Sequence, residues 1–333
     1  MTSVESLSTF MEMRLRQTCS MDEFDVVVVG AGAAGLAAAL TLARALRSVV
    51  VLDGGDTRNA AADHSHGVLG QDGVSPAELS HQARSEVEHF GGTILRDEVT
   101  GAALHGDGNF TVTTASGRGV KCRQILVAGG VRDEIPAVPG VHELWGDHVV
   151  ICPYCDGWEA RGSSIAILGT GPKSIFQAHL LRQWSDRVTL FSNTVVPPSA
   201  EDSARLASRS INVIDGGVDA IRSRDGGVVV IVGESTYEHD IVFTAPRPIP
   251  DNRVLMALGA NLIQNAAGIF PVIDDHGATT VTGLWAAGNA VNPSLKYSTA
   301  LGAGMDTATH INETLVEADI DNSVRQPGSG IAT

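Results

Sequence analysis

The first regular pattern of hydrophobic and polar positions begins with a short apolar run. Phe24–Val29 is rich in valine and predicts a buried strand, and the glycine-rich segment 30–35 follows it directly. Leu36–Leu46 alternates Ala and Leu without a helix breaker, which predicts a helix, and Val49–Leu52 predicts a second strand that ends at Asp53. Strand, turn, helix and strand together make a βαβ unit, the opening of a doubly wound parallel sheet.

The same pattern returns in the second half of the chain. Ser164–Leu168 predicts a strand, Gly169–Ser174 a glycine-containing turn, Ile175–Trp184 a helix and Arg187–Phe191 a further strand. Two dinucleotide-type folds in one chain indicate a duplicated α/β architecture with two Rossmann-like domains.

Alternating or β-branched segments elsewhere predict antiparallel structure. We expect a β-meander over 93–131 and a similar one over 228–232 and 241–243. Near the end, 283–289 predicts a strand and a turn, and about 297–317 predicts a helix. Residues 1–21 are expected to form a disordered or weakly helical extension, or else the true start is Met21. The Gly/Ser/Pro-containing tail 321–333 is expected to be disordered.

Composition and charge narrow the class of protein. The chain has 333 residues and a formal net charge of −15, which disfavours nucleic acid and anionic membranes as partners, since both require dense basic patches. No run of 18 apolar residues is present and residues 1–20 lack the apolar core of a signal peptide, so we expect a cytoplasmic protein without a membrane span.

Three glycines carry the first chemical signal. Gly30, Gly32 and Gly35 form G-x-G-x-x-G between a predicted strand and a predicted helix, the context in which this motif binds a dinucleotide. Gly30 permits the tight turn, Gly32 lets a pyrophosphate approach the backbone, and Gly35 allows close helix packing. Asp53, at the end of the next strand, is placed to accept a hydrogen bond from a ribose hydroxyl. A purely structural glycine turn is disfavoured because these features agree.

Cys152 and Cys155 carry the second signal. Two thiols three positions apart can close a disulfide and exchange it with another, and Asp156 can shuttle the proton that thiolate chemistry requires. A zinc site would need two further ligands, whereas Cys19 and Cys122 are isolated in the sequence. We therefore predict catalytic roles for Cys152, Cys155 and Asp156, and no metal.

The order of these motifs resembles the low-molecular-weight thioredoxin reductases over residues 22–318. The resemblance rests on the glycine fingerprint, C-x-x-C-D-G, the second glycine-rich βαβ unit and the segment 283–289, G-L-W-A-A-G-N. It implies FAD, a homodimer and two Rossmann-like domains of the three-layer ββα type. It also implies a discontinuous FAD domain, 22–148 plus 246–320, with an inserted domain at 149–245.

The resemblance also assigns residues to the flavin. Asn289 stands where Asp usually contacts the ribityl chain, and an amide can still accept and donate hydrogen bonds. Lys296-Tyr297 stands where the reductases carry Arg-Gln, so Lys296 either tunes the flavin ring or caps the last helix. By analogy Cys155 faces the flavin and Cys152 exchanges with substrate. The full predicted FAD set is Gly30, Gly32, Ala33, Ala34, Gly35, Asp53, Arg58, Asn59, Gly288, Asn289, Lys296 and Tyr297.

Two departures from the reductases shape the functional prediction. In the second βαβ unit, the strand that ends at Phe191 continues as Phe-Ser-Asn-Thr (191–194), without the His and Arg that bind the NADPH 2′-phosphate in the reductases. In the same unit, Pro172 removes a backbone N–H donor from the glycine-containing turn. The segments 53–59 and 64–73 resemble instead the subgroup that contains the gliotoxin and holomycin dithiol oxidases. There His64 and His66 are either proton carriers or loop histidines that support the flavin loop.

We therefore predict an FAD-dependent dithiol oxidase that closes an intramolecular disulfide in a small natural-product dithiol and passes the electrons to O2. The alternative is a reductase of thioredoxin or a small disulfide fed by NAD(P)H or ferredoxin. A non-catalytic flavoprotein or redox sensor is disfavoured by the intact cysteine pair with its neighbouring acid.

Overall fold

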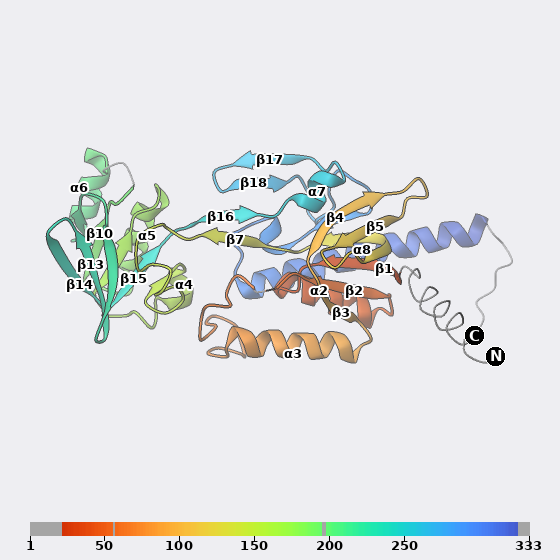
Figure 1. Ribbon diagram of the computed structural model, residues 1–333, viewed down its shortest axis with the longest axis horizontal. Helices are drawn as coiled ribbons and strands as arrows, with labels where there is room; N and C mark the ends of the chain where they lie inside the picture. The colour runs from red at the N-terminus through yellow and green to blue at the C-terminus, as the bar shows by residue number, and fades with distance from the viewer. Residues whose placement is uncertain (1–21, 56, 195–197, 326–333) are drawn as a thin grey trace, which may run out of the picture.

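The computed structural model describes residues 22–55, 57–194 and 198–325, which form two bodies joined by extended strands (Figure 1). The helices are α2 (Ala33–Arg44), α3 (Pro76–His89), α4 (Pro153–Asp156), α5 (Lys173–Leu181), α6 (Ala200–Ser208), α7 (Arg253–Ala257), α8 (Tyr297–Arg325) and the 3-10 turn η1 (Gly288–Ala290).

The strands of the larger body are β1 (Asp22–Val29), β2 (Val49–Asp53), β3 (Thr93–Arg96), β4 (Val99–Leu104), β5 (Phe110–Thr114), β6 (Gly119–Val127), β17 (Leu262–Asn265), β18 (Gly268–Pro271) and β19 (Leu284–Ala286). The smaller body contains β8 (Val149–Val150), β9 (Ile165–Leu168), β10 (Val188–Phe191), β11 (Asn212–Ile214), β12 (Ala220–Arg224), β13 (Gly227–Val232), β14 (Ser235–His239) and β15 (Ile241–Thr244). Between the bodies run β7 (Val131–Glu134) and β16 (Arg247–Pro250), paired antiparallel (Figure 1).

The larger body confirms the first predicted βαβ unit. Its seven-stranded sheet has the order β3-β2-β1-β6-β5-β4, with β19 also paired to β6, and β1 lies parallel to both β2 and β6. One part of the prediction was wrong, because Thr93–Arg96 pairs parallel with β2 instead of joining the meander. The crossover that makes this possible is α3, which begins at Ser75, whose hydroxyl accepts the Glu78 N–H.

The smaller body confirms the second predicted unit. Its parallel sheet has the order β11-β10-β9-β15-β8, and β12, β13 and β14 form a separate antiparallel sheet. Residues 241–243 were expected in the second meander, but as β15 they pair parallel with β9. Val242 and Phe243 are fully buried, and an unbroken apolar strand suits the centre of a parallel sheet covered on both faces.

Each body buries its parallel sheet between two layers, which confirms the three-layer ββα architecture. In the larger body, α2 and α8 pack on one face around Leu42 and Ile311, and Phe110 and Leu255 lie in the core of the other face. In the smaller body, α5 and α6 cover one face and the β12–β14 sheet covers the other. The layers leave the carboxyl ends of the parallel strands open for a ligand.

The last helix is longer than the sequence pattern indicated. α8 runs to Arg325, so residues 321–325 are helical and the predicted tail is wrong in that part, while 326–333 and the 1–21 extension lie outside the described residues. The extra turns are held by Asp319, whose carboxylate accepts from Arg47 Nη1 and Arg123 Nη2, each at 2.7 Å. Within the described part of the chain, no helix is long and apolar enough to cross a membrane.

Candidate cofactor and disulfide site

The first glycine turn has the shape that a pyrophosphate requires. Gly30 adopts a φ of 106° and donates its N–H to the Leu52 carbonyl at 2.9 Å. A Cβ on Gly35 would collide with the Gly30 carbonyl, so only glycine lets α2 start this close to β1. Gly32 caps α2 without a side-chain hydrogen bond, and the first turn holds no acidic residue, so its N–H groups remain available to an anion.

Three strand ends converge at this turn. Ala128 donates its N–H to the Val29 carbonyl at 2.8 Å, and Ala287 donates to the Val127 carbonyl at 3.0 Å. A Cβ on Gly288 would lie 2.6 Å from the Ala34 Cβ, so η1 packs directly on the start of α2. The fold therefore brings the predicted residues Ala33, Ala34, Gly288 and Asn289 to one edge of the sheet.

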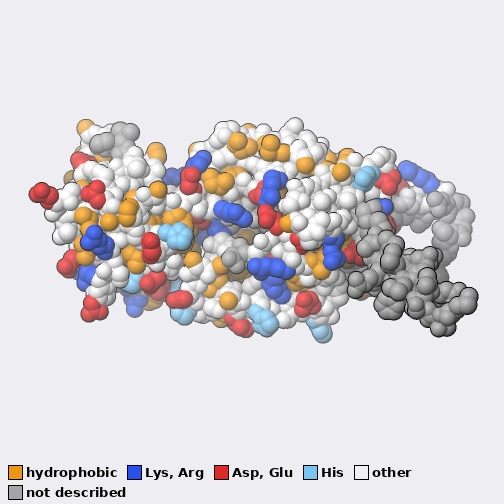
Figure 2. Space-filling view, viewed as in Figure 1, with side chains coloured by type: hydrophobic (Ala, Val, Ile, Leu, Met, Phe, Trp, Pro, Cys, Tyr) orange, Lys and Arg blue, Asp and Glu red, His pale blue; other side chains and the backbone are white. Residues whose placement is uncertain are grey.

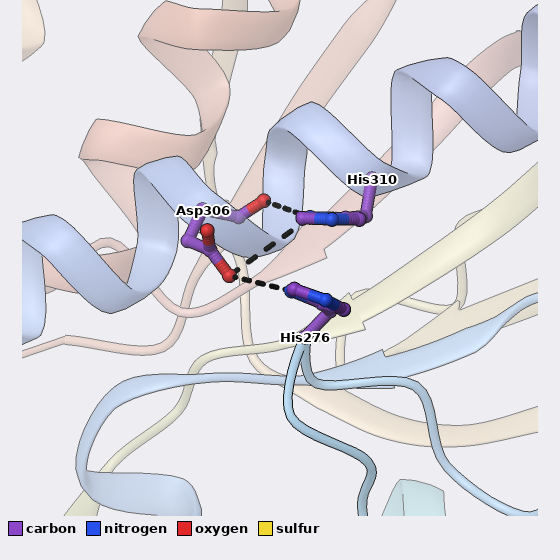
Figure 3. Close-up of side chains that lie close together, drawn as sticks. All are labelled: His276, Asp306 and His310. Carbon is purple, nitrogen blue, oxygen red and sulfur yellow. Dashed lines mark hydrogen bonds and ion pairs between the residues drawn. The ribbon is translucent and has the colours of Figure 1, made fainter.

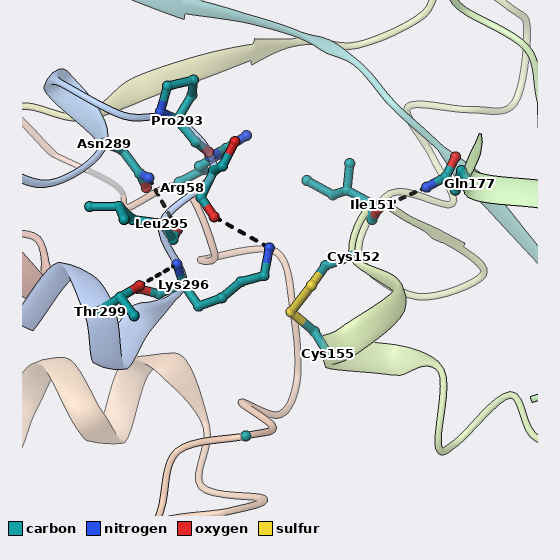
Figure 4. The surroundings of a disulfide bond; sticks show 12 residues. Arg58, Ile151, Cys152, Cys155, Gln177, Asn289, Pro293, Leu295, Lys296 and Thr299 are labelled. Carbon is teal, nitrogen blue, oxygen red and sulfur yellow. Dashed lines mark hydrogen bonds between the residues drawn. A yellow bond between two sulfur atoms is a disulfide. The ribbon is translucent and has the colours of Figure 1, made fainter. Parts of the chain in front are cut away.

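Asn289 uses its amide in a way that the usual Asp could not. Its Nδ2 donates to the Asn292 carbonyl at 3.0 Å and to the Leu295 carbonyl at 3.1 Å (Figure 4). These two bonds fold the 289–295 loop that leads to Lys296. The amide oxygen has no protein donor among the described residues, so it remains available to a flavin hydroxyl.

A cavity of about 450 Å³ opens at the end of β2, lined by residues that include Arg58, Arg96 and Arg132. Figure 2 shows Lys and Arg side chains gathered over the middle of this face, although the chain as a whole is acidic. The buried Asp53 carboxylate accepts from the Gly55 N–H at 3.0 Å and pairs with Arg84 Nη2 at 3.0 Å.

Of the predicted pair Arg58 and Asn59, Arg58 lines this cavity and Asn59 follows it in the chain. The Arg58 guanidinium makes a two-point contact with Asp133, 2.7 Å at each nitrogen, and donates to the Pro293 carbonyl. Asn59 Oδ1 accepts the Thr57 hydroxyl at 2.8 Å. The glycine cradle, the free N–H groups of α2 and this cationic cavity together fit the pyrophosphate and adenosine of FAD.

Cys152 and Cys155 form a disulfide with Cα atoms 5.2 Å apart, at the start of the short helix α4. The preceding residue is held by Gln177 of α5, whose Nε2 donates to the Ile151 carbonyl at 3.0 Å (Figure 4). A Cβ on Gly157 would come within 2.9 Å of the Trp184 ring, which explains the glycine in C-x-x-C-D-G. Gln177 could not be found from the sequence, because its role depends on packing between α4 and α5.

The half-buried Asp156 carboxyl lies in an acid–base cluster beside the disulfide. Burial, and then the nearby negative charge of Glu159, raise the pKa of Asp156 to about 6, and His66 acts in the opposite direction. His66 belongs to the larger body; its Nδ1 lies 3.4 Å from Asp72 and its Nε2 lies 3.7 Å from Glu159. His64 instead contacts the Gly73 carbonyl within its own loop. Of the two histidines, His66 therefore lies beside the acid–base cluster, and His64 supports the loop. Glu159 was missed by sequence reasoning.

Lys296 extends from the start of α8 toward the disulfide (Figure 4). Its Nζ lies 3.4 Å from the Ser294 carbonyl, and burial together with the charge of Arg58 lowers its pKa. The backbone N–H of Lys296 donates to the Thr299 hydroxyl at 2.8 Å. Thr299 therefore caps the backbone at the start of α8, and the Lys296 side chain takes no part in that cap. Tyr297, the first residue of α8, has a pKa raised by burial and then by Glu86.

The end of β10 contains polar side chains where the reductases hold a phosphate. Ser192 Oγ accepts the Gly216 N–H at 3.2 Å, and Asn193 bridges the Gly169 carbonyl and the Val218 N–H at 3.1 and 3.0 Å. Both side chains are thus engaged by the backbone. Moreover, the sequence carries no Lys or Arg between Arg187 and Arg205.

Two dinucleotide-type folds that share one cysteine pair define the class of flavoprotein disulfide oxidoreductases. Residues 24–309 match the family model described as pyridine nucleotide-disulphide oxidoreductase, and the chain belongs to that family. It is an FAD-binding oxidoreductase of the thioredoxin-reductase-like type.

Individual relatives agree with this assignment. The chain is 29% identical to thioredoxin reductase sirT of Leptosphaeria maculans, covering 89% of this chain and 96% of the relative. It is 34% identical to thioredoxin reductase tcpT of Claviceps purpurea, covering 62% and 70%. Among solved structures, HlmI superimposes with a TM-score of 0.87 at 39% identity, covering 91% and 96%. The resemblance to thioredoxin-reductase-like flavoproteins of the gliotoxin and holomycin type is thereby confirmed.

Proposed function

We propose that this protein is a dithiol oxidase, which closes an intramolecular disulfide in a small dithiol through Cys152 and Cys155 and delivers the electrons to O2. The proposal includes a discontinuous FAD domain, 22–148 plus 246–320, and an inserted domain, 149–245, that carries the cysteine pair. A homodimer in the cytoplasm stays a prediction from the sequence.

The observation that carries the proposal is that polar, uncharged side chains stand at the end of β10, where a phosphate-binding arginine would be needed. Tight binding of the NADPH 2′-phosphate relies on a fork of guanidinium donors, and here Asn193 instead ties Gly169 to Val218. Pro172 at the start of α5 offers no N–H to a phosphate. Among the described residues, the end of β10 therefore offers no guanidinium fork to the NADPH 2′-phosphate, which supports the proposal. From the larger body, the Lys296 side chain extends toward the disulfide (Figure 4).

The sulfur chemistry balances as two exchanges. A substrate thiolate attacks Cys152 Sγ, the Cys152–Cys155 bond breaks, and its electron pair goes to Cys155 Sγ. The second substrate thiolate then attacks the substrate sulfur of the mixed disulfide, releasing the Cys152 thiolate and a cyclic disulfide. Asp156 takes up a thiol proton in these steps. FAD, when bound, accepts the two electrons of the cysteine pair and supplies them to O2, which with two protons becomes hydrogen peroxide.

The decisive experiment is anaerobic mixing of the holoenzyme with a small dithiol, NADPH or NADH while the visible band of the flavin is followed. We expect the dithiol alone to bleach the flavin rapidly, and colour and peroxide to appear when air is admitted. Fast bleaching by NADPH would overturn the proposal and make the chain a pyridine-nucleotide-dependent disulfide reductase.

A matched control separates the cysteine route from direct reduction of the flavin by the dithiol. Cys152→Ser keeps the fold of α4 and removes the exchanging sulfur, so bleaching by the dithiol should become slow while the flavin stays bound. Cys122→Ser alters a buried thiol in the core of the larger body and should leave the bleaching rate unchanged.

A further inference from the structure

A cluster of two histidines and an aspartate lies outside the cofactor and disulfide site (Figure 3). His276 belongs to the segment between β18 and β19, and Asp306 and His310 lie one turn apart on α8. The two imidazole rings stack with centroids 3.6 Å apart and planes 20° apart. Asp306 Oδ2 lies 3.3 Å from His276 Nδ1 and 3.9 Å from His310 Nδ1.

The backbone fixes His276 against the helix. Asp274 Oδ1 accepts the N–H groups of His276 and Ala278, each at 2.9 Å, which closes a tight turn. Gly277 adopts a φ of 91°, and a Cβ there would lie 2.6 Å from the Thr307 hydroxyl on α8. The three side chains therefore meet because two elements pack closely, and their approach does not depend on a flexible loop.

The surroundings of the cluster are negative. His276, His310 and Trp285 border a cavity of about 390 Å³ together with the carboxylates Asp274, Glu313 and Glu317, and no Lys or Arg is among its described lining residues. Glu313 Oε2 lies 4.0 Å from His310 Nε2 and adds negative charge beside the ring. Such a field attracts a cation to the imidazoles.

We propose that His276, Asp306 and His310 bind a divalent transition-metal ion of the Zn²⁺ type. Imidazole and carboxylate form a donor set that suits Zn²⁺, and tetrahedral bonds of about 2.0–2.1 Å hold ligand atoms about 3.3 Å apart. The 3.3 Å between Asp306 Oδ2 and His276 Nδ1 matches this spacing, and His310 Nδ1, at 3.9 Å from Asp306 Oδ2, moves closer when the ion binds. The ion ties the β18–β19 segment to α8 and so braces β19, which leads to Asn289.

Binding changes the local hydrogen bonds in a defined way. His310 Nδ1 lies 3.0 Å from the Asp306 carbonyl and so carries a proton in the absence of the ion. With the ion on Nδ1, each neutral ring carries its proton on Nε2 instead, and one ring tilts out of the stack so that the Nδ1 lone pairs converge.

The test is calorimetric titration of Zn²⁺ into the FAD-loaded, disulfide-closed full chain, free of affinity tags and treated first with a chelator. We expect one Zn²⁺ per chain with a micromolar or tighter dissociation constant, and a melting temperature that rises with the Zn²⁺ concentration. In His276→Ala and His310→Ala, affinity should fall more than about 100-fold, since losing even an outer-shell partner costs about 10- to 100-fold.

His66→Ala is the matched control, because His66 is the other described histidine placed between two carboxylates, Asp72 and Glu159. The proposal predicts unchanged Zn²⁺ binding in that variant. It is overturned by millimolar binding, by equal binding in the His276 and His310 variants, or by loss of binding in His66→Ala. Unchanged flavin absorbance and circular dichroism establish that each variant is folded, and Asp306→Asn provides a third, nearly isosteric test.

Discussion

At the scale of single residues, the chemistry of the disulfide depends on how three titratable side chains from two bodies influence one another. Asp156 is half-buried and its pKa is raised to about 6 by that burial and by Glu159, while His66 reaches the pair from the other body. A carboxyl that titrates near neutrality is suited to move protons for thiols.

This arrangement predicts the pH dependence of dithiol oxidation. Asp156 accepts a proton only as the carboxylate, so kcat/KM for a small dithiol should rise as pH increases through about 6. Asp156→Asn should remove that rise and lower the rate by about 10²- to 10⁴-fold. The measurement is the steady-state rate of peroxide formation between about pH 5 and 7.5, a range that extends roughly one pH unit or more on either side of the Asp156 pKa.

Variants of the two charged neighbours of Asp156 should shift this pH profile in opposite directions. Glu159→Gln removes a charge that raises the pKa of Asp156, so the rise should move to lower pH. His66→Asn removes a charge that lowers it, so the rise should move to higher pH. Shifts in the same direction, or none in either variant, would contradict the assignment of Asp156 as the base.

Asn289 provides a prediction about cofactor binding. In Asn289→Asp the side chain loses both donors and turns a carboxylate toward the carbonyls of Asn292 and Leu295. Each neutral hydrogen bond contributes about 0.5–1.5 kcal/mol, so the FAD dissociation constant should rise about 10-fold or more, measured by flavin fluorescence on dilution.

Asn292→Asp is the control for that change. Asn292 uses its Oδ1 to accept the Ser294 N–H at 3.0 Å, and a carboxylate keeps this bond while adding the same charge to the same loop. FAD affinity should be nearly unchanged in the control. If Asn289→Asp bound FAD as tightly as the parent, the described role of the amide would be wrong.

How far the sequence predicted the site differs from residue to residue. Gly30, Gly35 and Cys152–Cys155 belong to short motifs in which spacing alone implies geometry, and the structure places them as expected. Glu159 and Gln177 could not be found in this way, because each acts across an interface between elements. The catalytic and cofactor roles of the predicted residues remain predictions.

At the scale of elements, the packing of α8 on α2 positions the phosphate-binding end of α2. A Cβ on Gly304 would collide with the Ala34 carbonyl, so the two helices touch along their backbones next to the glycine turn. The N–H groups at the start of α2 are therefore held in place by Gly304, which lies far away in the sequence.

Gly304→Ala should disturb this contact. Overpacking typically costs about 1–3 kcal/mol, which exceeds the gain in helix propensity of about 1 kcal/mol for replacing Gly by Ala. We expect a lower melting temperature and loss of FAD during gel filtration. Gly302→Ala is the matched control two positions earlier, where a Cβ meets nothing within 4 Å and the change should stabilise the helix.

Element boundaries were predicted less well than element types. The β15 strand was placed in a meander because the apolar run of three residues at 241–243 has no periodicity that distinguishes parallel from antiparallel pairing. The end of α8 was set too early, since Asp319 stabilises the last turns through Arg47 and Arg123, which lie far away in sequence. Both errors come from tertiary contacts that override local pattern.

At the scale of the whole molecule, the proposed function gives each of the two bodies one store of electrons. The disulfide belongs to the smaller body at the start of α4, and the glycine turn that fits FAD belongs to the larger one. Each store takes two electrons, and Lys296 extends from the larger body toward the disulfide of the smaller one (Figure 4).

The electron capacity of the chain tests this division directly. Under anaerobic conditions, full reduction of the protein by excess dithiol should form about two equivalents of oxidised dithiol per FAD, because the cysteine pair and the flavin each take one pair of electrons. In Cys155→Ser only the flavin can store a pair, so the end point should fall to about one equivalent and be reached slowly. Quantification of the oxidised dithiol formed from a thermodynamically strong dithiol measures both end points, whereas the visible band of the flavin reports only the electron pair that the flavin holds. An end point of one equivalent in the parent protein would mean that the cysteine pair does not store electrons alongside the flavin, and the proposed route through Cys152 and Cys155 would fail.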